Sequence, residues 1–449
     1  MVLPTIGTAS FPEAPGPLAE VRRIGADASA SAGGRIIRIG DAAAEGWRST
    51  PVLTAEADGA NIRVFLDDVD PYRDFRGGMP PKPLPADDVA RWRQLLKGAW
   101  PLLVAQNRPH AEAIAAAVIS IDPLPATESH RPYSGSSNAS FAGVRASMPN
   151  DDEQCAETLV HETRHVTLGA LLQLKKFIDA DDGPLLYAPW RDDPRPLSGQ
   201  LQGVYAFVGI TGFWRQRSGP AATFEFALRK MQVDRVLAAL GEETRLSPDG
   251  RALIAGLSGT AATWSTEPVA PEATRLAADA TADHYAQWRM LHMPAPRDWV
   301  TAAANAWRHG RPCPPVPIDP RACPVTDVRA RDLDGRAILI RRMLRDRAEF
   351  DARAGKPAFI SETTRGTLPP DAALFSGDPE RARNGYLARL ADEPRNRHAW
   401  SGLGLTLRAL GDPASTLLLE RPELINAVLA ECAGAGTTEL VAWMWAAAR

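Results

Sequence analysis

The chain has 449 residues, which is long enough for two or three domains with a substantial core. Apolar residues make up 45% and charged residues 23%, and 51 Lys and Arg against 54 Asp and Glu leave a formal net charge of −3, as is ordinary for a soluble globular protein. This balance excludes the strongly basic composition that indicates a nucleic-acid partner.

The first 20 residues, MVLPTIGTASFPEAPGPLAE, have neither the basic start nor the apolar run of a secretory signal. No apolar stretch reaches the roughly 18 residues that a membrane span needs. The four cysteines have no CxxC spacing and are too few for a disulfide framework in a chain of this size. We therefore expect a cytoplasmic protein with reduced thiols and no membrane partner.

The N-terminal region, 1–90, is expected to contain an arm and a small β-unit. Residues 1–34 are rich in Ala, Gly, Ser and Pro, which predicts a loosely held arm with one short helix. Over 35–70, two β-prone runs flank Asp58 and Gly59, a dipeptide that favours a tight hairpin because Gly tolerates positive φ. The small β-unit is therefore placed at 35–70.

A Pro-rich break at 80–88 is followed by VARWRQLLKGAWPLLVAQN, whose apolar residues have helical spacing. The next segment, AEAIAAAVISIDPL, predicts a helix and then a strand, and 134–149 alternates small and apolar residues as a strand does. Three polar residues at 150–152 can cap the helix that we expect at about 153–178.

The second half of the chain is predicted to be helical. A long polar loop at 179–196 precedes helices expected at about 197–216, 219–240, 247–258 and 271–292. A Pro-rich linker at 311–325 indicates a domain boundary. Beyond it, PERARNGYLARLADEPRNRHAWSGLGLTLRALG is typical of one tetratricopeptide-like helix-turn-helix repeat.

The predicted fold class is thus α+β and mainly α-helical. It combines the N-terminal β-unit with a helical HExxH catalytic domain at 91–310 and a helical, tetratricopeptide-like C-terminal domain at 326–449. The C-terminal helices are expected to support the catalytic domain, with binding of a leader peptide as the alternative.

The segment LVHETRHVTLGALLQL, 159–174, carries an HExxH motif. His161 and His165 lie four residues apart on one helix face, so both imidazoles can reach one metal ion. Glu162 is placed to act on a metal-bound water in a peptidase. The alternative is a surface helix with solvated histidines. The apolar residues around the motif favour a buried helix instead, whose polar groups need partners.

A zinc peptidase needs a third protein ligand. Gln202 is one candidate by position, Glu225 is the best carboxylate, and His284 is the next histidine along the chain. The residues leave this choice open, so the zinc-peptidase interpretation is incomplete.

Two arginines follow the motif in PWRDDPRP. Arg191 and Arg195 are held by prolines and adjacent carboxylates, which suits them to bidentate recognition of a carboxylate. The alternative is that they form salt bridges to Asp192 and Asp193.

Four segments, in this order, resemble a known family. They are S-SS--SF-GV--SMP-D (134–151), LVHETRHVTLGALLQL (159–174), YAPWRDDPRPLSGQLQGVYAFVGITGFWR (187–215) and ADHYAQWRMLH (282–292). The pattern resembles the HExxH-motif peptide-modification proteins of ribosomal-peptide clusters, whose members act as 2-oxoglutarate- and iron-dependent peptide β-hydroxylases. The likeness extends to 66–75, 398–411 and 421–429, and so covers most of the chain.

The resemblance implies roles for individual residues. His161, His165 and Gln202 would hold Fe(II), although many relatives have a histidine where this chain has Gln202. A glutamine oxygen is a neutral ligand that Fe(II) accepts, and a bound 2-oxoglutarate dianion would supply the missing charge. Either Arg191 or Arg195 would bind the distal carboxylate of 2-oxoglutarate.

Glu162 then has a different role, because hydroxylation needs no hydrolytic water. It is expected to orient a metal ligand or Arg164. The strand at 138–147 is expected to pair with the substrate peptide by strand addition, with the side chains at positions 138 and 140, Asn138 and Ser140, in contact with it.

The predicted function is therefore β-hydroxylation of a side chain in a ribosomally synthesised precursor peptide, with Fe(II) and 2-oxoglutarate as cofactors and no nucleic-acid partner. Two alternatives remain: a gluzincin-like zinc metallopeptidase, and a metal-free module that binds a leader peptide.

Overall fold

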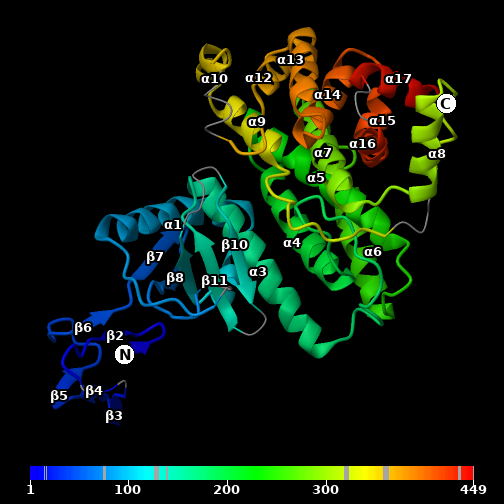
Figure 1. Cartoon of the computed structure of the whole chain (residues 1–449). Coiled ribbons are helices and arrows are strands. Elements are labelled where there is room, and N and C mark those ends of the chain that lie inside the picture. The colour runs from blue at the N-terminus through cyan, green and yellow to red at the C-terminus, as the bar shows by residue number, and fades with distance from the viewer. Residues whose placement is uncertain are drawn as a thin grey trace. The chain divides into compact units, whose positions relative to one another are not determined.

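The computed structural model describes residues 1–14, 16, 18–73, 77–125, 131–137, 140–317, 323–356, 364–432 and 436–447. The chain divides into two compact units, Met1–Leu174 and Lys175–Arg449. The fold is α+β and mainly helical, as predicted, and every named strand belongs to the first unit (Figure 1). None of the helices in the described parts of the chain is long and apolar enough to cross a membrane.

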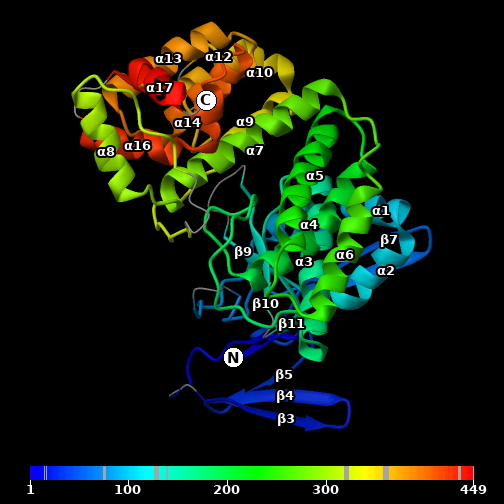
Figure 2. The ribbon, with the colours of Figure 1, turned by 90° about the vertical axis from the view of Figure 1, so that its right-hand side faces the viewer.

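Two small antiparallel sheets form the N-terminal end of the first unit. One contains β1 (Val2–Leu3), β2 (Gly7–Ala9) and β6 (Trp47–Ser49), and the other contains β3 (Glu20–Ile24), β4 (Asp27–Ala32) and β5 (Arg35–Arg38). The second sheet runs as a ribbon of three adjacent strands in Figure 2. Ala9, Ala30, Ile37 and Trp47 form a small core.

The prediction of a loose arm with one short helix over 1–34 is therefore wrong. The described residues of this stretch form β1 to β4. In β4 the sequence DASASA places alanines on one face, where Ala30 is fully buried opposite Ile37 of β5. Small side chains thus complete a sheet here without the bulky apolar pattern that usually marks a strand.

The main sheet of the first unit has the strand order β10-β11-β9-β8-β7. Its strands are β7 (Val52–Ala57), β8 (Ala60–Leu66), β9 (Ser120–Leu124), β10 (Ser134–Ser137) and β11 (Ser140–Ser147). The predicted hairpin joins β7 to β8 through Asp58 and Gly59, which have φ of 47° and 75°. The strands β8, β9 and β11 are parallel to one another, and β10 is antiparallel to β11.

Three helices pack against this sheet: α1 (Ala86–Gln106), α2 (Arg108–Ala117) and α3 (Asp152–Leu174). The Nε1 of Trp100 on α1 donates a 2.9 Å hydrogen bond to the carbonyl of Ala60 on β8. The helix α3 contacts β10 and β11. Asp151 caps it by accepting a 2.8 Å bond from the backbone N–H of Gln154, which confirms the predicted polar start of the motif helix.

The second unit consists of helices and the segments that connect them. Their bounds are α4 (Leu197–Arg215), α5 (Pro220–Gly241), α6 (Pro248–Ala262), α7 (Pro271–His292), α8 (Arg297–Arg308), α9 (Gly335–Arg345), α10 (Arg347–Arg353), α12 (Pro369–Phe375), α13 (Pro379–Asp392), α14 (Arg397–Ala409), α15 (Ser415–Glu420), α16 (Pro422–Glu431) and α17 (Thr437–Ala447). The helices α13 and α14 form the predicted helix-turn-helix pair.

One hydrophobic core extends through this unit from Phe224 on α5 to Met444 on α17. The helices that follow residue 326 therefore share their core with α5 and α7. The division at 174–175 also falls within the segment 91–310 that was expected to be one domain. The three expected domain ranges stay a prediction about function, while the packing defines two units.

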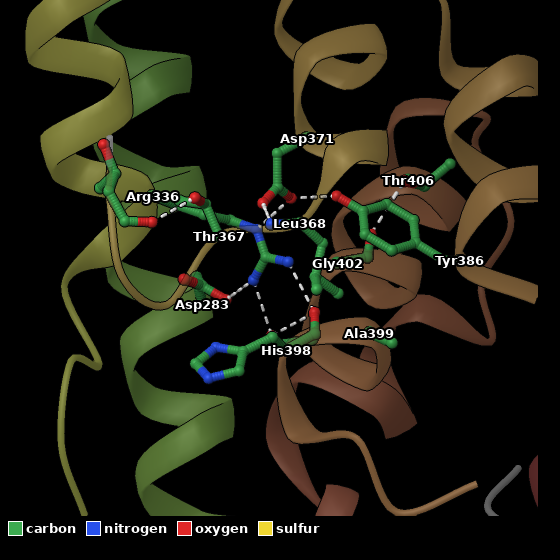
Figure 3. Close-up of polar contacts among 12 residues, drawn as sticks. Asp283, Arg336, Thr367, Leu368, Asp371, Tyr386, His398, Ala399, Gly402 and Thr406 are labelled. Atoms are coloured by element: carbon green, nitrogen blue, oxygen red, sulfur yellow. Dashed lines mark hydrogen bonds and ion pairs between the residues drawn. The ribbon is translucent and has the colours of Figure 1, made fainter. Parts of the chain in front are cut away.

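A fully buried arginine joins several helices of the second unit (Figure 3). Arg336 on α9 donates from Nε to Asp371 on α12 at 2.7 Å and from Nη1 to Asp283 on α7. Its remaining bonds go to Ser401 Oγ at 2.8 Å and the carbonyl of His398 at 2.6 Å. Burial raises the pKa of Asp283, and the charge of Arg336 opposes that rise. Four elements thus depend on one guanidinium.

We expect Arg336→Leu to destabilise the protein by about 3–5 kcal/mol, because it leaves two buried carboxylates without their counter-ion. The free energy of unfolding in urea measures this loss. The control is Arg353→Leu, which removes an arginine that is 44% exposed and pairs with Glu349. That control should cost less than about 1 kcal/mol. Equal losses for the two variants would show that the buried arginine has no special structural role.

Candidate functional site

The two histidines of the HExxH motif face each other on α3. Their Nε2 atoms are 3.0 Å apart, and their rings meet edge to face with centroids 4.6 Å apart. Two imidazole nitrogens that each bind one ion at about 2.1 Å lie roughly 3.0 Å apart at adjacent octahedral positions and roughly 3.4 Å apart at tetrahedral ones. The distance of 3.0 Å therefore fits a shared metal ion, and it equally fits a hydrogen bond in which one Nε2 donates to the other.

Glu162 lies between this pair and the edge of the main sheet. Its side chain is fully buried, and its Oε1 accepts a 2.6 Å hydrogen bond from Ser134 Oγ on β10. The same Oε1 lies 3.9 Å from His161 Nε2. Burial raises the pKa of Glu162, while His165, Ser134 and Ser136 act to lower it. Its Oε2 has no hydrogen-bond partner among the residues that the structure describes.

The described residues of the first unit supply only part of the coordination sphere that a metal ion needs. His161 and His165 offer two nitrogen ligands, and the unpartnered Glu162 oxygen offers a buried acceptor for a ligand of the metal. Within the described ranges, no group of three or more His, Cys, Asp or Glu side chains is arranged to hold an ion. The remainder of the coordination sphere stays a prediction.

The polar loop that follows α3 belongs to the second unit and is closed at its base. Leu186 and Arg195 exchange two backbone hydrogen bonds, of 2.7 and 2.9 Å. Trp190 stacks on Phe207 of α4, with ring centroids 4.1 Å apart and planes 15° apart. Gly203 allows this approach, because a Cβ there would lie 2.7 Å from the Trp190 Nε1. The arginine loop, 186–195, is thus fixed to α4.

Buried side chains also hold the backbone of the arginine loop. Gln200 Nε2 donates to the Tyr187 carbonyl, and Gln232 Nε2 donates to the Pro189 carbonyl at 3.0 Å. His292, which is fully buried, donates from Nε2 to the Asp192 carbonyl at 2.8 Å. Three side chains from three helices therefore preorganise the segment that carries Arg191 and Arg195.

Both arginines of the loop bind the same neighbouring carboxylate. Arg191 Nε donates to Asp193 Oδ1 at 3.0 Å, and Arg195 Nη1 donates to Asp193 Oδ2 at 3.0 Å. Burial acts to raise the pKa of Asp193, but the two guanidinium groups outweigh it and lower that pKa. The local salt bridges weighed as an alternative are therefore present for Asp193. A carboxylate ligand would have to compete with Asp193 for these groups.

Unlike Asp193, the carboxylate of Asp192 binds backbone N–H groups. Its carboxylate accepts backbone N–H bonds from Asp332 at 3.0 Å and Leu333 at 3.2 Å. Within the described residues, the salt bridges of Arg191 and Arg195 go to Asp193, so the alternative of salt bridges to both aspartates is confirmed for Asp193 only. Asp192 instead ties the arginine loop to the segment that precedes α9.

The three candidates for a third metal ligand all belong to the second unit, where the bonds of Glu225 and His284 are as follows. Glu225 binds Arg341 with both oxygens and lies 3.4 Å from Arg229. Burial raises its pKa, and the arginines outweigh this effect and lower it. His284 is buried, its Nδ1 lies 2.8 Å from the Tyr187 hydroxyl, and burial lowers its pKa to about 4. Gln202 is half-buried on α4.

The expected substrate strand needs a correction. β11 pairs with β10 on one side and β9 on the other, so it is an inner strand that cannot take a further partner. The edge strand beside α3 is β10. Asn138 and the side chain of Ser140 lie outside the described residues, and their expected contact with substrate stays a prediction.

Sequence reasoning missed several residues that build these two segments. The sequence shows Ser134 only as part of a motif, and it gives no signal for Gln200, Gln232 or His292. Each of them bonds to a group far away in the sequence, and no local pattern indicates such a bond. The small-residue run SGSS before the motif helix is the one local feature that favours a close approach to α3.

Neither a scan against protein-family models nor a search of curated proteins finds a match for this chain. The family resemblance of the sequence therefore stays a prediction.

Replacement of either motif histidine should abolish tight metal binding. We expect His161→Ala and His165→Ala each to weaken binding of Fe(II) or Co(II) by more than about 100-fold, because loss of an orienting residue alone costs 10–100-fold. Anaerobic calorimetric titration measures the affinity. His309→Ala is the control, since His309 is exposed and bonds to the carbonyl of Asn305 on its own helix. Unchanged affinity in the two motif variants would contradict a metal site on α3.

Proposed function

We propose that this chain is an Fe(II)- and 2-oxoglutarate-dependent hydroxylase that acts on a side-chain Cβ in a ribosomally synthesised precursor peptide. The sequence resemblance suggests the reaction. The facing pair His161 and His165, with Nε2 atoms 3.0 Å apart, is the observation that carries the proposal, because it gives α3 the means to hold a metal.

The burial of Glu162 and its hydrogen bond to Ser134 support a role in orienting other groups more than a role as a general base in hydrolysis. A general base in peptide hydrolysis has to take a proton from a water. Glu162 is instead fully buried and already bonded through Oε1 to Ser134. A carboxylate fixed in this way, 3.9 Å from His161 Nε2, would act on the histidine pair through its charge and not through a hydrogen bond.

The chain's own residues would have separate tasks in this reaction. His161 and His165 would hold the iron, with Gln202 as the proposed third ligand. The preorganised arginine loop would present Arg191 or Arg195 to the distal carboxylate of 2-oxoglutarate in exchange for Asp193. When bound, iron and 2-oxoglutarate would allow dioxygen to act as the oxidant: decarboxylation of 2-oxoglutarate to succinate and CO₂ would provide two of the four electrons that dioxygen takes up, and the substrate C–H bond would provide the other two.

A zinc peptidase is the second candidate, and one observation favours it. Glu162 Oε2 has no hydrogen-bond partner in the described part of the chain, and Oε1 lies only 3.9 Å from His161 Nε2. A water held by a metal on the histidine pair would be within reach of such a carboxylate. The two candidates therefore share the same metal helix and differ in cosubstrate and product.

The deciding experiment incubates anaerobically purified protein with Fe(II), 2-oxoglutarate, oxygen and candidate precursor peptides taken from short reading frames next to its gene. Mass spectrometry should show a gain of one oxygen that disappears when 2-oxoglutarate is omitted. Peptide cleavage with Zn(II) and without cosubstrate would favour the peptidase. Absence of both products, together with no bound metal by elemental analysis, would favour a metal-free peptide-binding module.

Gln202 can be tested with a pair of substitutions. Gln202→Ala should lower iron occupancy, whereas Gln202→His should preserve or raise it, because imidazole is a strong ligand for iron. Elemental analysis of anaerobically reconstituted protein measures both. Gln216→Ala is the control, since Gln216 is exposed at the C-cap of α4. If Gln202→Ala keeps its iron, the third ligand is another residue, with His284 and Glu225 next to be tested.

A further inference from the structure

A second candidate binding site lies among the C-terminal helices of the second unit. It is a groove of about 740 Å³, which we call the arginine groove. The charged residues that line it are Glu272, Arg275, Asp279, Arg347 and Arg408. They come from α7, α10 and α14, and the end of α12 and the start of α13 complete the walls.

The positive charge of the arginine groove is organised around one buried carboxylate. Asp279 is only 8% exposed and accepts bonds from Arg275 Nη1 at 3.1 Å and Arg408 Nη2 at 2.5 Å. The third arginine, Arg347, lies 3.7 Å from Glu272 and binds Asp351 on its own helix. The lining thus has three positive and two negative groups, a surplus of one positive charge.

The three arginines of the groove are more exposed to solvent than Asp279. The side chains of Arg275, Arg347 and Arg408 are 56%, 49% and 37% exposed, whereas that of Asp279 is 11% exposed. The buried carboxylate of Asp279 binds two of the guanidinium groups that line the groove. This arrangement reduces the entropy that an incoming anion would otherwise have to remove from long side chains.

The size and walls of the groove limit the kind of anion. Its volume falls in the range of sites for drug-sized ligands, about 300–1,000 Å³, and is far larger than one phosphate needs. Ala278, Pro379 and Ala409 add small apolar surfaces between the charges. The positive groups of the groove are three separate guanidinium groups on three helices, which suits a short segment with separate carboxylates.

We propose that the arginine groove binds an acidic segment of an extended peptide, whose carboxylates pair with Arg275, Arg347 and Arg408. Guanidinium forks bind carboxylates in bidentate geometry, and small apolar residues of the peptide would contact the alanines. The proposal requires neither a metal nor 2-oxoglutarate, so it stands or falls independently of the proposed hydroxylase activity.

Fluorescence anisotropy of the full chain at low ionic strength tests this site. The probe is a labelled 12-residue peptide of alternating Glu and Ala, and the reference replaces every Glu by Gln. We expect the Glu peptide to bind at least about tenfold more tightly, since each partly screened ion pair contributes roughly two- to fivefold. Equal binding of the two peptides would overturn the proposal.

Charge variants locate the site. Arg347→Gln should weaken binding of the Glu peptide about threefold or more, and Glu272→Gln should strengthen it by a similar factor. Arg353→Gln makes the same charge change on α10, outside the groove, and should have no effect. An equal effect of Arg353→Gln, no effect of Arg347→Gln, or displacement of the peptide by an equal concentration of inorganic phosphate would each contradict a peptide site. Unchanged melting temperatures confirm that the variants are folded.

Discussion

The candidate site of the first unit depends on one buried carboxylate. A charged group without water is costly unless it is bonded, so Glu162 requires a partner from outside its own helix. Ser134 on the edge strand β10 provides it, at 2.6 Å. This bond connects α3 to the main sheet at the turn of the helix that carries His161 and His165. The sequence motif alone gives two histidines and a glutamate. The bond from β10 shows that the glutamate is a buried acceptor held against the main sheet, beside the two histidines.

In the second unit, too, buried polar groups are bonded to partners from other elements. Arg336 has no access to water and is paired with Asp283 and Asp371, and the Asp192 carbonyl of the arginine loop is bonded by the fully buried His292. Both of these buried side chains bond to distant segments of the chain, which makes the packing around them specific. The arginine loop is therefore rigid before any ligand arrives. In contrast, the arginine groove is built from exposed guanidinium groups whose pairing can change.

Local features of the sequence predicted much of this structure. They could not predict the bonds between residues that lie far apart in the sequence. The Asp58 and Gly59 hairpin, the cap at Asp151 and the bounds of the central helices follow from turn chemistry and helical periodicity. The strands of 1–34 were missed because alanine and serine carry little β-propensity and acquire it here from the register with β5. At the site, the histidine pair could be predicted, and so could the pairing of the arginines with Asp193 as an alternative. The bond from Ser134 could not, because no spacing rule connects residues 28 positions apart in different elements.

The origin of the oxygen atom in the product distinguishes hydroxylation from hydrolysis on the metal helix α3. A reaction of the full chain with Fe(II), 2-oxoglutarate and precursor peptide under ¹⁸O₂ should yield a peptide that carries one ¹⁸O and is not cleaved. This result is expected because a hydroxylase takes the inserted atom from dioxygen. A peptide that is cleaved and takes its label from H₂¹⁸O, with no label from ¹⁸O₂, would contradict the account and assign the metal helix to hydrolysis.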